Sequence, residues 1–404
     1  MVNEVKWEGI ASKMNKNEYH LRKSKNTNEE LNDIYHLWQE CFGDSDSYMD
    51  FYFRHVIPKN RVISLYDENE IVSMLHLNPY ELIVLGKKVT ANYIVGVATK
   101  PSYRKRGLMR NLMEESFRQM YKNKESFTYL MPIAKEIYEP FDFSIVYEQE
   151  PWNYRMLRVP CELVGNEKDH NDIIDIELIN GEMANENKSV YDKDSLVTFA
   201  NEELSKKYNV YVPRNKEYFD ILLDEVTCCG GGFLIFKQED DILGYIAYMF
   251  DDMFHIVELI CKDEYQEKLV GEAYKIYCHV NKEKSDNINR FQTTIMMRII
   301  HFEEFIKNVR SNEKVSFVME VEDEILTENK GIYLLEIDED KGSVKRINEE
   351  PQVRVNVKQL VDLFFDRMSK EDMYSIVVSE DKKEILEKLN KIIKYNKVFI
   401  NDVV

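Results

Sequence analysis

The sequence predicts an α+β protein made of three mixed domains. Its 404 residues exceed the roughly 250–300 residues beyond which a single hydrophobic core usually stops growing. A composition of 44% hydrophobic and 31% charged residues is typical of a globular chain and excludes wholesale disorder. A hairpin, a strand and a helix follow one another twice along the chain, and a more strand-rich pattern begins near residue 293. We therefore expect domains over 1–150, 151–292 and 293–404.

The first predicted domain alternates helices and strands. Leu31, Ile34 and Leu37 recur at helical spacing, and Asp44-Ser45-Asp46 is an N-cap pattern that predicts the start of a second helix. A further helix is predicted over 108–121 and a short helical turn over 136–141. Runs of β-branched and aromatic residues bounded by turn residues predict strands over 61–66, 71–77, 80–85, 91–98, 127–131 and 144–147.

The second and third predicted domains differ in their pattern. The second has a helix from residue 216, strands over 233–237, 242–250 and 254–261, and a helix over 265–280. The third has the strand-like runs KVSFVMEV, GIYLLEI and PQVRVNV, and then an amphipathic helix over 381–396 with one apolar stripe. The chain ends in KVFINDVV, an extended apolar tail.

The charge balance limits the expected partners. With 54 basic and 73 acidic residues the formal net charge is −19, which disfavours nucleic acid because phosphate contacts need basic surface. The charge fits a small cationic amine or a basic peptide, and it equally fits a solvated acidic surface kept for solubility. The longest uncharged apolar run, 242–250, is too short to cross a bilayer, so no membrane is expected as a partner. The N-terminal stretch lacks the apolar core of a secretory signal, and we expect a cytoplasmic protein.

The spacing of cysteine and histidine does not indicate a metal site. The six cysteines form no CxxC pair, and the eight histidines show no HxxxH spacing. Buried or half-buried free thiols are the expectation for cysteines scattered along a chain in a reducing compartment. We expect no metal.

The stretch VATKPSYRKRGLMRNLMEESF, residues 97–117, carries the most informative pattern. A predicted strand ends there, a loop with several basic residues follows, and Gly107 opens a helix. The unpaired amides and the dipole of a helix N-terminus attract an anion, and a glycine lets a phosphate approach the backbone. The spacing matches neither GxxxxGK[ST] nor GxGxxG, so neither ATP nor a dinucleotide is the expected ligand.

The segment Arg104-Lys105-Arg106-Gly107-Leu108-Met109 resembles the R/Q-x-x-G-x-G/A signature of the GNAT acetyltransferases, with Met109 in place of the usual small residue. The RxRGLxR form and the three-part organisation are similar to the Eis-like (enhanced intracellular survival) branch over nearly the whole chain. The resemblance implies two GNAT-like mixed-sheet domains, the second degenerate, followed by a sterol-carrier-protein-like α/β domain. It also implies acetyl-CoA as the co-substrate and a homo-hexamer.

The resemblance assigns cofactor-binding residues to three segments. The basic loop and the helix start would hold the pyrophosphate, and the backbone of the preceding strand would pair with the pantetheine arm. A glycine inside that strand suits such a close backbone approach. Two residues after the fifth strand would flank the arm on its other side, where the family usually has small polar residues. The residues implied are Val95, Gly96, Val97, Arg104, Lys105, Arg106, Gly107, Leu108, Met109, Arg110, Ile133 and Ala134.

Tyr138 is the candidate general acid. Acetyl transfer needs a deprotonated amine, a stabilised oxyanion and a proton donor for the leaving thiolate. The segment IAKEIYEPFDF resembles the family's IYxxFGY segment, and Tyr138 falls on its tyrosine. A phenol with a reference pKa of about 10 stays protonated at neutral pH and can deliver that proton. His76, on a predicted strand, is expected to be packed rather than catalytic.

For the base, the resemblance points to the C-terminal carboxylate, which belongs to Val404. In Eis-like enzymes this carboxylate enters the active site. With a reference pKa of about 3.5 it would act through water or on an amine whose pKa is depressed. A tail that ends on two valines agrees with burial. The alternative for the same tail is a β-strand that completes the sheet of the third domain.

The second domain has CKDEYQEK where the first has SYRKRG, and this acidic segment has no glycine. We expect the second domain to wall the substrate cleft without binding a cofactor. We expect the apolar strands and the helix of the third domain to form a hydrophobic core rather than a lipid cavity. The expected function is an acetyl-CoA-dependent N-acetyltransferase acting on a cationic amine, aminoglycoside-like or lysine. The alternative is a carrier of an apolar ligand with a vestigial GNAT part.

Overall fold

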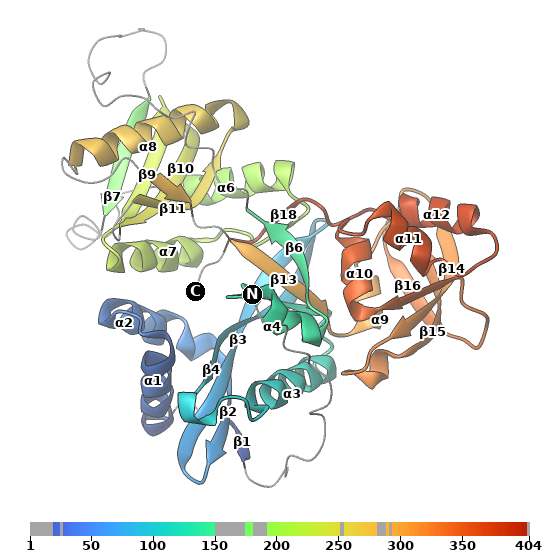
Figure 1. Cartoon of the computed structure of the whole chain (residues 1–404). Coiled ribbons are helices and arrows are strands. Elements are labelled where there is room, and N and C mark those ends of the chain that lie inside the picture. Colours follow the sequence, from blue (N-terminus) through green and yellow to red (C-terminus); the bar gives the residue numbers. More distant parts are fainter. Residues whose placement is uncertain are drawn as a thin grey trace, which may run out of the picture.

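The computed structural model describes residues 19–24, 27–149, 174–180, 192–250, 254–280, 288–290 and 293–401. The described strands form three sheets, which lie in the three parts of the molecule in Figure 1 and which we call the first, second and third units. Helices pack on each sheet, and the predicted α+β fold class is confirmed. No helix in the described part of the chain has the length and hydropathy needed to cross a membrane.

The first unit is built on a mixed sheet of nine described strands. Seven follow the order β1-β2-β3-β4-β5-β13-β6, and β8 and β18 branch from β3. The bounds are β1 His20–Lys23, β2 Arg61–Asp67, β3 Glu70–Val84, β4 Lys87–Thr99, β5 Phe127–Leu130, β6 Ser144–Glu148, β8 Val210–Tyr211, β13 Thr294–Ile299 and β18 Val398–Phe399. The strands predicted over 71–77 and 80–85 are one continuous strand, β3, which passes through Pro79.

Two layers of helices enclose this sheet because its strands alternate apolar side chains between both faces. Val62 of β2 packs into the cluster of α1 and α2, whereas its neighbour Ile63 packs into the cluster of α3. Thr27 forms a capping box at the start of α1, and the Ser45 hydroxyl caps α2, as the Asp44-Ser45-Asp46 pattern predicts. The bounds are α1 Asn28–Phe42, α2 Asp46–His55, α3 Leu108–Lys122 and α4 Lys135–Tyr138.

Strands from later in the chain complete the first sheet. β13 lies between β5 and β6 and is antiparallel to both. β18 pairs with β8, and β8 pairs with β3. The first sheet therefore contains strands from all three predicted domain ranges, 1–150, 151–292 and 293–404. The alternative predicted for the tail is wrong in its partner, because the strand forms but joins the first sheet and not that of the third unit.

The second unit repeats the element order of the first, as the sequence predicts. β9, β10 and β11 are antiparallel, α8 follows, and β12 returns parallel to β11, which matches β2, β3, β4, α3 and β5. The sheet has the order β12-β11-β10-β9-β7. The bounds are β7 Asp175–Asn180, β9 Gly232–Gln238, β10 Asp241–Phe250, β11 Phe254–Cys261, β12 Ile288–Arg290, α6 Lys193–Lys207, α7 Lys216–Cys228 and α8 Gln266–Val280.

The third unit has a sheet of order β16-β15-β14-β17 with short helices around it. The predicted helix over 381–396 is too long at its end: α12 stops at Lys391, because Ile392 turns to an extended conformation and bridges to Ser311. The bounds are β14 Val315–Glu322, β15 Gly331–Ile337, β16 Gly342–Arg346, β17 Val353–Asn356, α9 Phe302–Ile306, α10 Val357–Phe364, α11 Lys370–Ile376 and α12 Lys382–Lys391.

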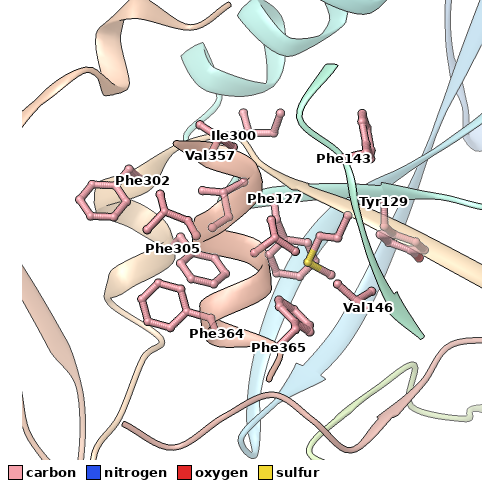
Figure 2. Close-up of a cluster of buried hydrophobic side chains, with 14 of the residues drawn as sticks. Phe127, Tyr129, Phe143, Val146, Ile300, Phe302, Phe305, Val357, Phe364 and Phe365 are labelled. Carbon is pink, nitrogen blue, oxygen red and sulfur yellow. The ribbon is translucent and has the colours of Figure 1, made fainter. Parts of the chain in front are cut away.

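The first and third units share one hydrophobic core. Figure 2 shows Phe364 and Phe365, at the end of α10, beside Phe127 of β5 and Val146 of β6. All four side chains are buried. Because α10 covers the part of the first sheet that contains β13 and β6, the two units are expected to unfold together.

We predict that Ile299→Ala destabilises the whole protein. Ile299 is fully buried on β13, and removing its side chain should lower the free energy of unfolding by about 2–5 kcal/mol. Denaturant titration followed by fluorescence and by circular dichroism checks this. Val344→Ala on strand β16, where the side chain is half-buried, is the control and should cost under about 1 kcal/mol. An early transition confined to the third unit would contradict the shared core.

Candidate active site

Strands β4 and β5 separate in the middle of the first sheet. Their parallel pairing consists of Asn92 with Thr128 and Tyr93 with Tyr129. β5 ends at Leu130, whereas β4 continues to Thr99 along β3. Among the described strands, none pairs with residues 94–99 of β4 on the side away from β3. This open edge offers backbone N–H and C=O groups to a ligand.

Gly96 forms a bulge within that open edge. The register shifts between Met74 and His76 of β3, and Gly96 has a φ of +60°. A Cβ on Gly96 would lie 2.5 Å from Cζ3 of Trp38. The glycine is therefore required by the left-handed backbone and by packing of Trp38 on α1, and the half-buried Val95 and Val97 flank it.

The helix that follows this strand starts without a side-chain cap. Gly107, at φ +78°, is the N-cap of α3, and the first turn of the helix holds no acidic residue. Side chains of Thr27, Ser45 and Asn215 cap α1, α2 and α7. An uncapped N-terminus leaves backbone N–H groups and the positive end of the helix dipole available for an anion.

The basic residues of the loop divide into two groups. Arg104 and Arg106 shape the loop, since Arg104 Nε donates to Thr99 O (3.1 Å) and Arg106 Nη2 donates to Ser102 O (3.0 Å). Lys105, at φ +63°, is exposed. Arg110 lies in the first turn of α3, and its guanidinium is 4.8 Å from the ring centre of Phe141. The predicted pyrophosphate loop therefore forms a compact positive surface whose helix start contacts the segment that carries Tyr138.

Tyr138 ends the short helix α4 and is 7% exposed. Its ring meets Phe143 edge to face, with 6.1 Å between centres. Burial raises the pKa of Tyr138 to about 12. The phenol therefore stays protonated throughout the neutral range, as a proton donor must.

The residues between β5 and α4 are exposed. Ile133 is 90% exposed, and Ala134 is the half-buried N-cap of α4. An isoleucine so exposed at the open side of β4 and β5 is available to contact a bound molecule.

A cavity of about 300 Å³ lies between the first and second units. Its walls come from α2, from β3 at residues 78–81, from α7 and from β11, and Asn401 of the C-terminal tail also lines it. Asn78 pairs with Tyr93, the residue after which β4 and β5 separate. The register of the sheet thus places this cavity wall opposite residues 90–93 of β4, directly before its open edge.

The charge of the cavity is mainly acidic. Three carboxylates line it, those of Glu81, Glu217 and Glu225, against Lys59 and His55. Lys59 Nζ is 2.6 Å from Glu217, which joins the first unit to α7 at the rim. The rest of the lining is largely aromatic and aliphatic. Such a cavity suits a compact ligand with a cationic group and an apolar body.

A buried ion pair fixes the C-terminal tail beside the cavity. Glu258 of β11 is fully buried and accepts hydrogen bonds from Arg214, Tyr218 (2.8 Å) and Asn401 Nδ2 (2.9 Å). Arg214 Nη2 also donates to Asn401 Oδ1 (2.9 Å). Burial alone would raise the pKa of Glu258, but the Arg214 charge and these donors lower it, so the carboxylate is ionised at neutral pH.

The second unit keeps the open strand but loses the anion loop. Among the described residues, β11 pairs with β12 over residues 254–256 and then continues to Cys261, as β4 does beside β5. Lys207 of α6 donates to the Cys261 carbonyl and pairs with Asp263. Asp263 and Glu264 replace the basic loop, so this strand end repels a phosphate.

His76 is packed, as predicted. It is fully buried, its Nδ1 lies 2.9 Å from the Tyr52 hydroxyl, and it contacts the Trp38 ring. Burial lowers the pKa of His76 to about 3, which keeps the imidazole neutral. A neutral ring enclosed by Trp38 and Tyr52 has no access to a substrate.

The structure brings the predicted residues together in part. The open edge around Gly96, the loop through Gly107 and the Tyr138 segment meet at one end of β4 and β5, whereas Val404 lies outside the described residues. Sequence reasoning missed Asn401, Arg214 and Glu258. Only the polar Asn401 in an apolar tail could have indicated this cluster, because its members are far apart in the sequence.

Two family models match the chain. Residues 22–146 match the acetyltransferase (GNAT) domain, and residues 302–401 match the sterol carrier protein domain. No curated protein resembles the chain significantly in sequence. The first match contains the open edge of β4, the loop and Tyr138, and the second ends at Asn401.

Solved structures of similar fold cover nearly the whole chain. A probable N-acyltransferase from Enterococcus faecalis has 17% identity and a TM-score of 0.72, covering 93% of this chain and 97% of its own. A GCN5-related N-acetyltransferase from Anabaena variabilis has 14% identity and a TM-score of 0.72, with 95% and 100% covered. Eis1 from Mycobacterium abscessus has 13% identity and a TM-score of 0.66, with 96% and 100% covered. At these identities the likeness concerns the fold.

We predict that Gly107→Glu weakens binding of acetyl-CoA. The substitution places a side chain and a negative charge at the N-cap of α3, so the dissociation constant should rise at least about tenfold, or roughly 1.4 kcal/mol. Calorimetric titration measures it. Gly86→Glu is the matched control, since Gly86 also has a positive φ (+77°) and open space around it but lies at the β3–β4 turn. Equal affinities of the two variants would contradict the loop assignment.

Proposed function

Because the chain is a GNAT acetyltransferase with the fold of the Eis-like branch, we propose that it moves an acetyl group from acetyl-CoA to a primary amine of a compact cationic acceptor. The observation that carries the proposal is the meeting of an open strand edge, an uncapped basic helix start and an acidic cavity. Cytoplasmic location and a homo-hexamer are part of the same proposal.

Two features of the first unit would bind acetyl-CoA. The N-terminus of α3 with Arg104, Lys105, Arg106 and Arg110 would hold the pyrophosphate, since free amides and basic side chains attract its charge. The open edge at Val95–Val97 would pair with the amide groups of the pantetheine arm. Leu108 is buried and Met109 is half-buried, so these two support the helix start from below.

The reaction needs two proton movements. The amine nitrogen forms a bond to the acetyl carbon, the carbon–sulfur bond breaks, and the leaving thiolate takes a proton. Tyr138 would give that proton, since burial keeps its phenol protonated in the neutral range. Backbone N–H groups on the open edge of β4 are available to stabilise the oxyanion of the intermediate. The amine proton passes to a base.

The C-terminal carboxylate of Val404 is the proposed base. Asn401 is the last described residue of the tail, is 3% exposed and lines the cavity. The Arg214–Glu258 pair fixes Asn401 at the cavity wall. A carboxylate there would accept the amine proton directly or through water, and the acidic lining would hold the acceptor's charge.

The cavity also favours one type of acceptor. Pockets for drug-sized ligands measure roughly 300–1,000 Å³, so a cavity of about 300 Å³ is at the small end. A lysine side chain or a small alkyl or arylalkyl amine fits that space better than an entire aminoglycoside. The carrier alternative is not favoured, because Phe364, Tyr333 and other side chains of the third unit fill its own core.

We predict that Tyr138→Phe lowers kcat by roughly 10²–10⁴-fold, because the ring stays packed and only the proton donor is lost. The affinity for acetyl-CoA should stay within about twofold of the parent's, given that the substitution leaves the loop untouched. Steady-state thiol release measures kcat, and calorimetric titration measures the affinity for acetyl-CoA. Tyr121→Phe is the control, since Tyr121 stacks on His301 at the far end of α3 and should keep full activity. A Tyr138→Phe variant with parental kcat would show that another group is the acid.

We predict that extending the C-terminus abolishes transfer. A short peptide added after Val404 removes the α-carboxylate of Val404, which the proposal assigns to the cavity, but leaves Asn401 and its partners in place. Acetyl-CoA affinity and melting temperature should therefore be nearly unchanged while kcat falls by about 10² or more. The same peptide added to the N-terminus is the control. Full activity of the extended protein would remove Val404 from the mechanism.

A further inference from the structure

Arg298 is a fully buried charge at the joint between the first and third units. It lies on β13, and the strand pairing places it opposite Thr128 of β5. Its Nη2 donates to Asp323 Oδ1 (2.9 Å), its Nη1 is 4.0 Å from Asp142 Oδ2, and its guanidinium is 5.0 Å from the ring centre of Phe117. One side chain thus contacts the third unit, helix α3 and the turn after the Tyr138 segment.

This burial is costly for a structural element alone. Removing a guanidinium from water costs several kcal/mol, and an apolar residue of similar size is often neutral or stabilising at such a site. Arg298 Nε and Nη1 are buried without a hydrogen-bond partner among the described residues, so Nη1 and Asp142 interact through charge alone and the cost is only partly offset. We therefore attribute the burial of the Arg298 charge to the elements that it holds in position.

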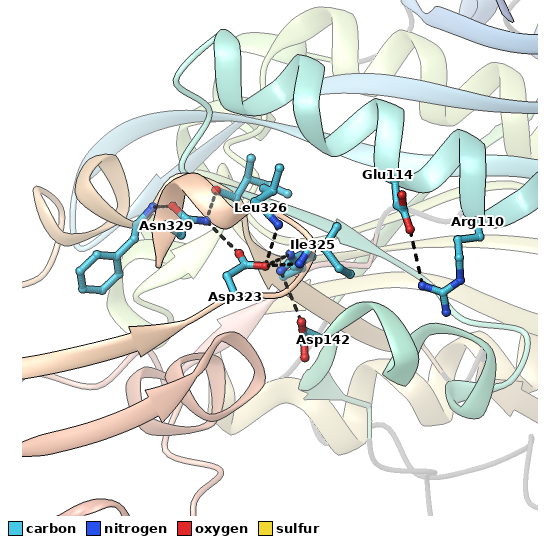
Figure 3. A network of polar contacts seen from close by, with 10 residues as sticks. Arg110, Glu114, Asp142, Asp323, Ile325, Leu326 and Asn329 are labelled. Atoms are coloured by element: carbon cyan, nitrogen blue, oxygen red, sulfur yellow. Dashed lines mark hydrogen bonds and ion pairs between the residues drawn. The ribbon is translucent and has the colours of Figure 1, made fainter. Parts of the chain in front are cut away.

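The Asp323 side of the contact is rigid. Its carboxylate also accepts hydrogen bonds from the backbone N–H groups of Ile325 (3.0 Å) and Leu326 (2.8 Å). Asn329 Nδ2 donates to its other oxygen (3.0 Å) and to the Ile300 carbonyl (2.8 Å). Figure 3 shows these groups converging on Asp323, with Asp142 on the other side of the contact. Arg298 is therefore anchored to a fixed point.

Asp142 lies in the same short segment as Tyr138, the candidate acid. Asp142 follows Tyr138 after the single 3₁₀ turn Glu139–Phe141 and has a φ of +60°. The third unit contacts the same short segment twice more. Lys358 Nζ is 3.3 Å from Glu139 Oε1, and the Ser144 hydroxyl donates to Asp362 of α10. The segment that positions Tyr138 is thus held from the third unit.

We propose that Arg298 is a positioning residue that, through Asp142, fixes the segment of the catalytic Tyr138 to the third unit. The proposal rests on the assignment of Tyr138 as the acid. It gives the sterol-carrier-like unit a role in the reaction that needs no lipid: this unit sets the orientation of the phenol relative to the open edge of β4. A displacement of about 1 Å at a reacting group can reduce a rate by roughly 10²-fold.

Asp142→Asn tests the proposal with little risk to folding. Asparagine tolerates the left-handed conformation at this position, so the substitution removes the charge while keeping the turn. We expect kcat to fall roughly tenfold, with KM for acetyl-CoA and the melting temperature nearly unchanged. Asp142→Glu retains the charge and should recover part of kcat.

Glu148→Gln is the matched control. Glu148 lies 3.7 Å from Arg367 of the third unit, at the far end of β6, so this variant removes another carboxylate from the same interface away from Tyr138. It should keep parental kcat. A similar loss of kcat in both variants, or parental kcat in Asp142→Asn, would overturn the proposal.

The double variant Tyr138→Phe/Asp142→Asn separates the two assignments. If Arg298 and Asp142 act through the phenol, the double variant should be no slower than Tyr138→Phe alone. Multiplying losses would show that Asp142 acts elsewhere, which overturns the positioning role while leaving Tyr138 as the acid. Parental kcat in Tyr138→Phe would instead contradict the proposed function itself.

Discussion

Strand β13 is the constraint on which the rest of this structure depends. It comes after the second unit in the sequence, yet it lies between β5 and β6 of the first sheet, and it leads directly into α9 of the third unit. The edges of β5 and β6 would otherwise expose unpaired backbone groups. Because β13 pairs within the first sheet and continues directly into the third unit, the third unit is fixed beside the segment that contains Tyr138. The chain then returns as β18, which pairs with β8 at the edge of the first sheet. This pairing places Asn401 at the cavity.

Two buried ion pairs mark the two joints of the molecule. Arg214 and Glu258 both bind Asn401 and so join the second unit to the C-terminal tail, and Arg298–Asp323 joins the third unit to the first sheet. Buried pairs of this kind add little net stability, but breaking one leaves an uncompensated charge that is strongly unfavourable. Each pair therefore favours one relative placement of the elements over others. Both pairs lie beside a component of the proposed reaction, the cavity in one case and the Tyr138 segment in the other.

The sequence was sufficient to predict the local elements and the anion loop. Runs of β-branched and aromatic residues between turn residues predicted β2, β4 and β10, and the basic residues from Lys100 to Arg110 predicted the anion-binding helix start. These features depend on neighbours in the chain. The insertion of β13, the pairing of β18 with β8 and the Arg298–Asp142 contact join residues far apart in the sequence. No periodicity or spacing encodes such contacts. For the same reason the end of α12 was misplaced, since a bridge between Ile392 and Ser311 terminates the helix.

The central claim is that acetyl-CoA is the donor and a compact cationic amine the acceptor. Release of free thiol from acetyl-CoA tests it most directly. The full chain is assayed against a panel of amines that ranges from lysine and small alkyl or arylalkyl amines to aminoglycosides. The account predicts release that depends on the amine and saturates, with the compact amines giving higher kcat/KM than the aminoglycosides. Thiol release that is the same with and without every amine, or no release at all, would contradict it.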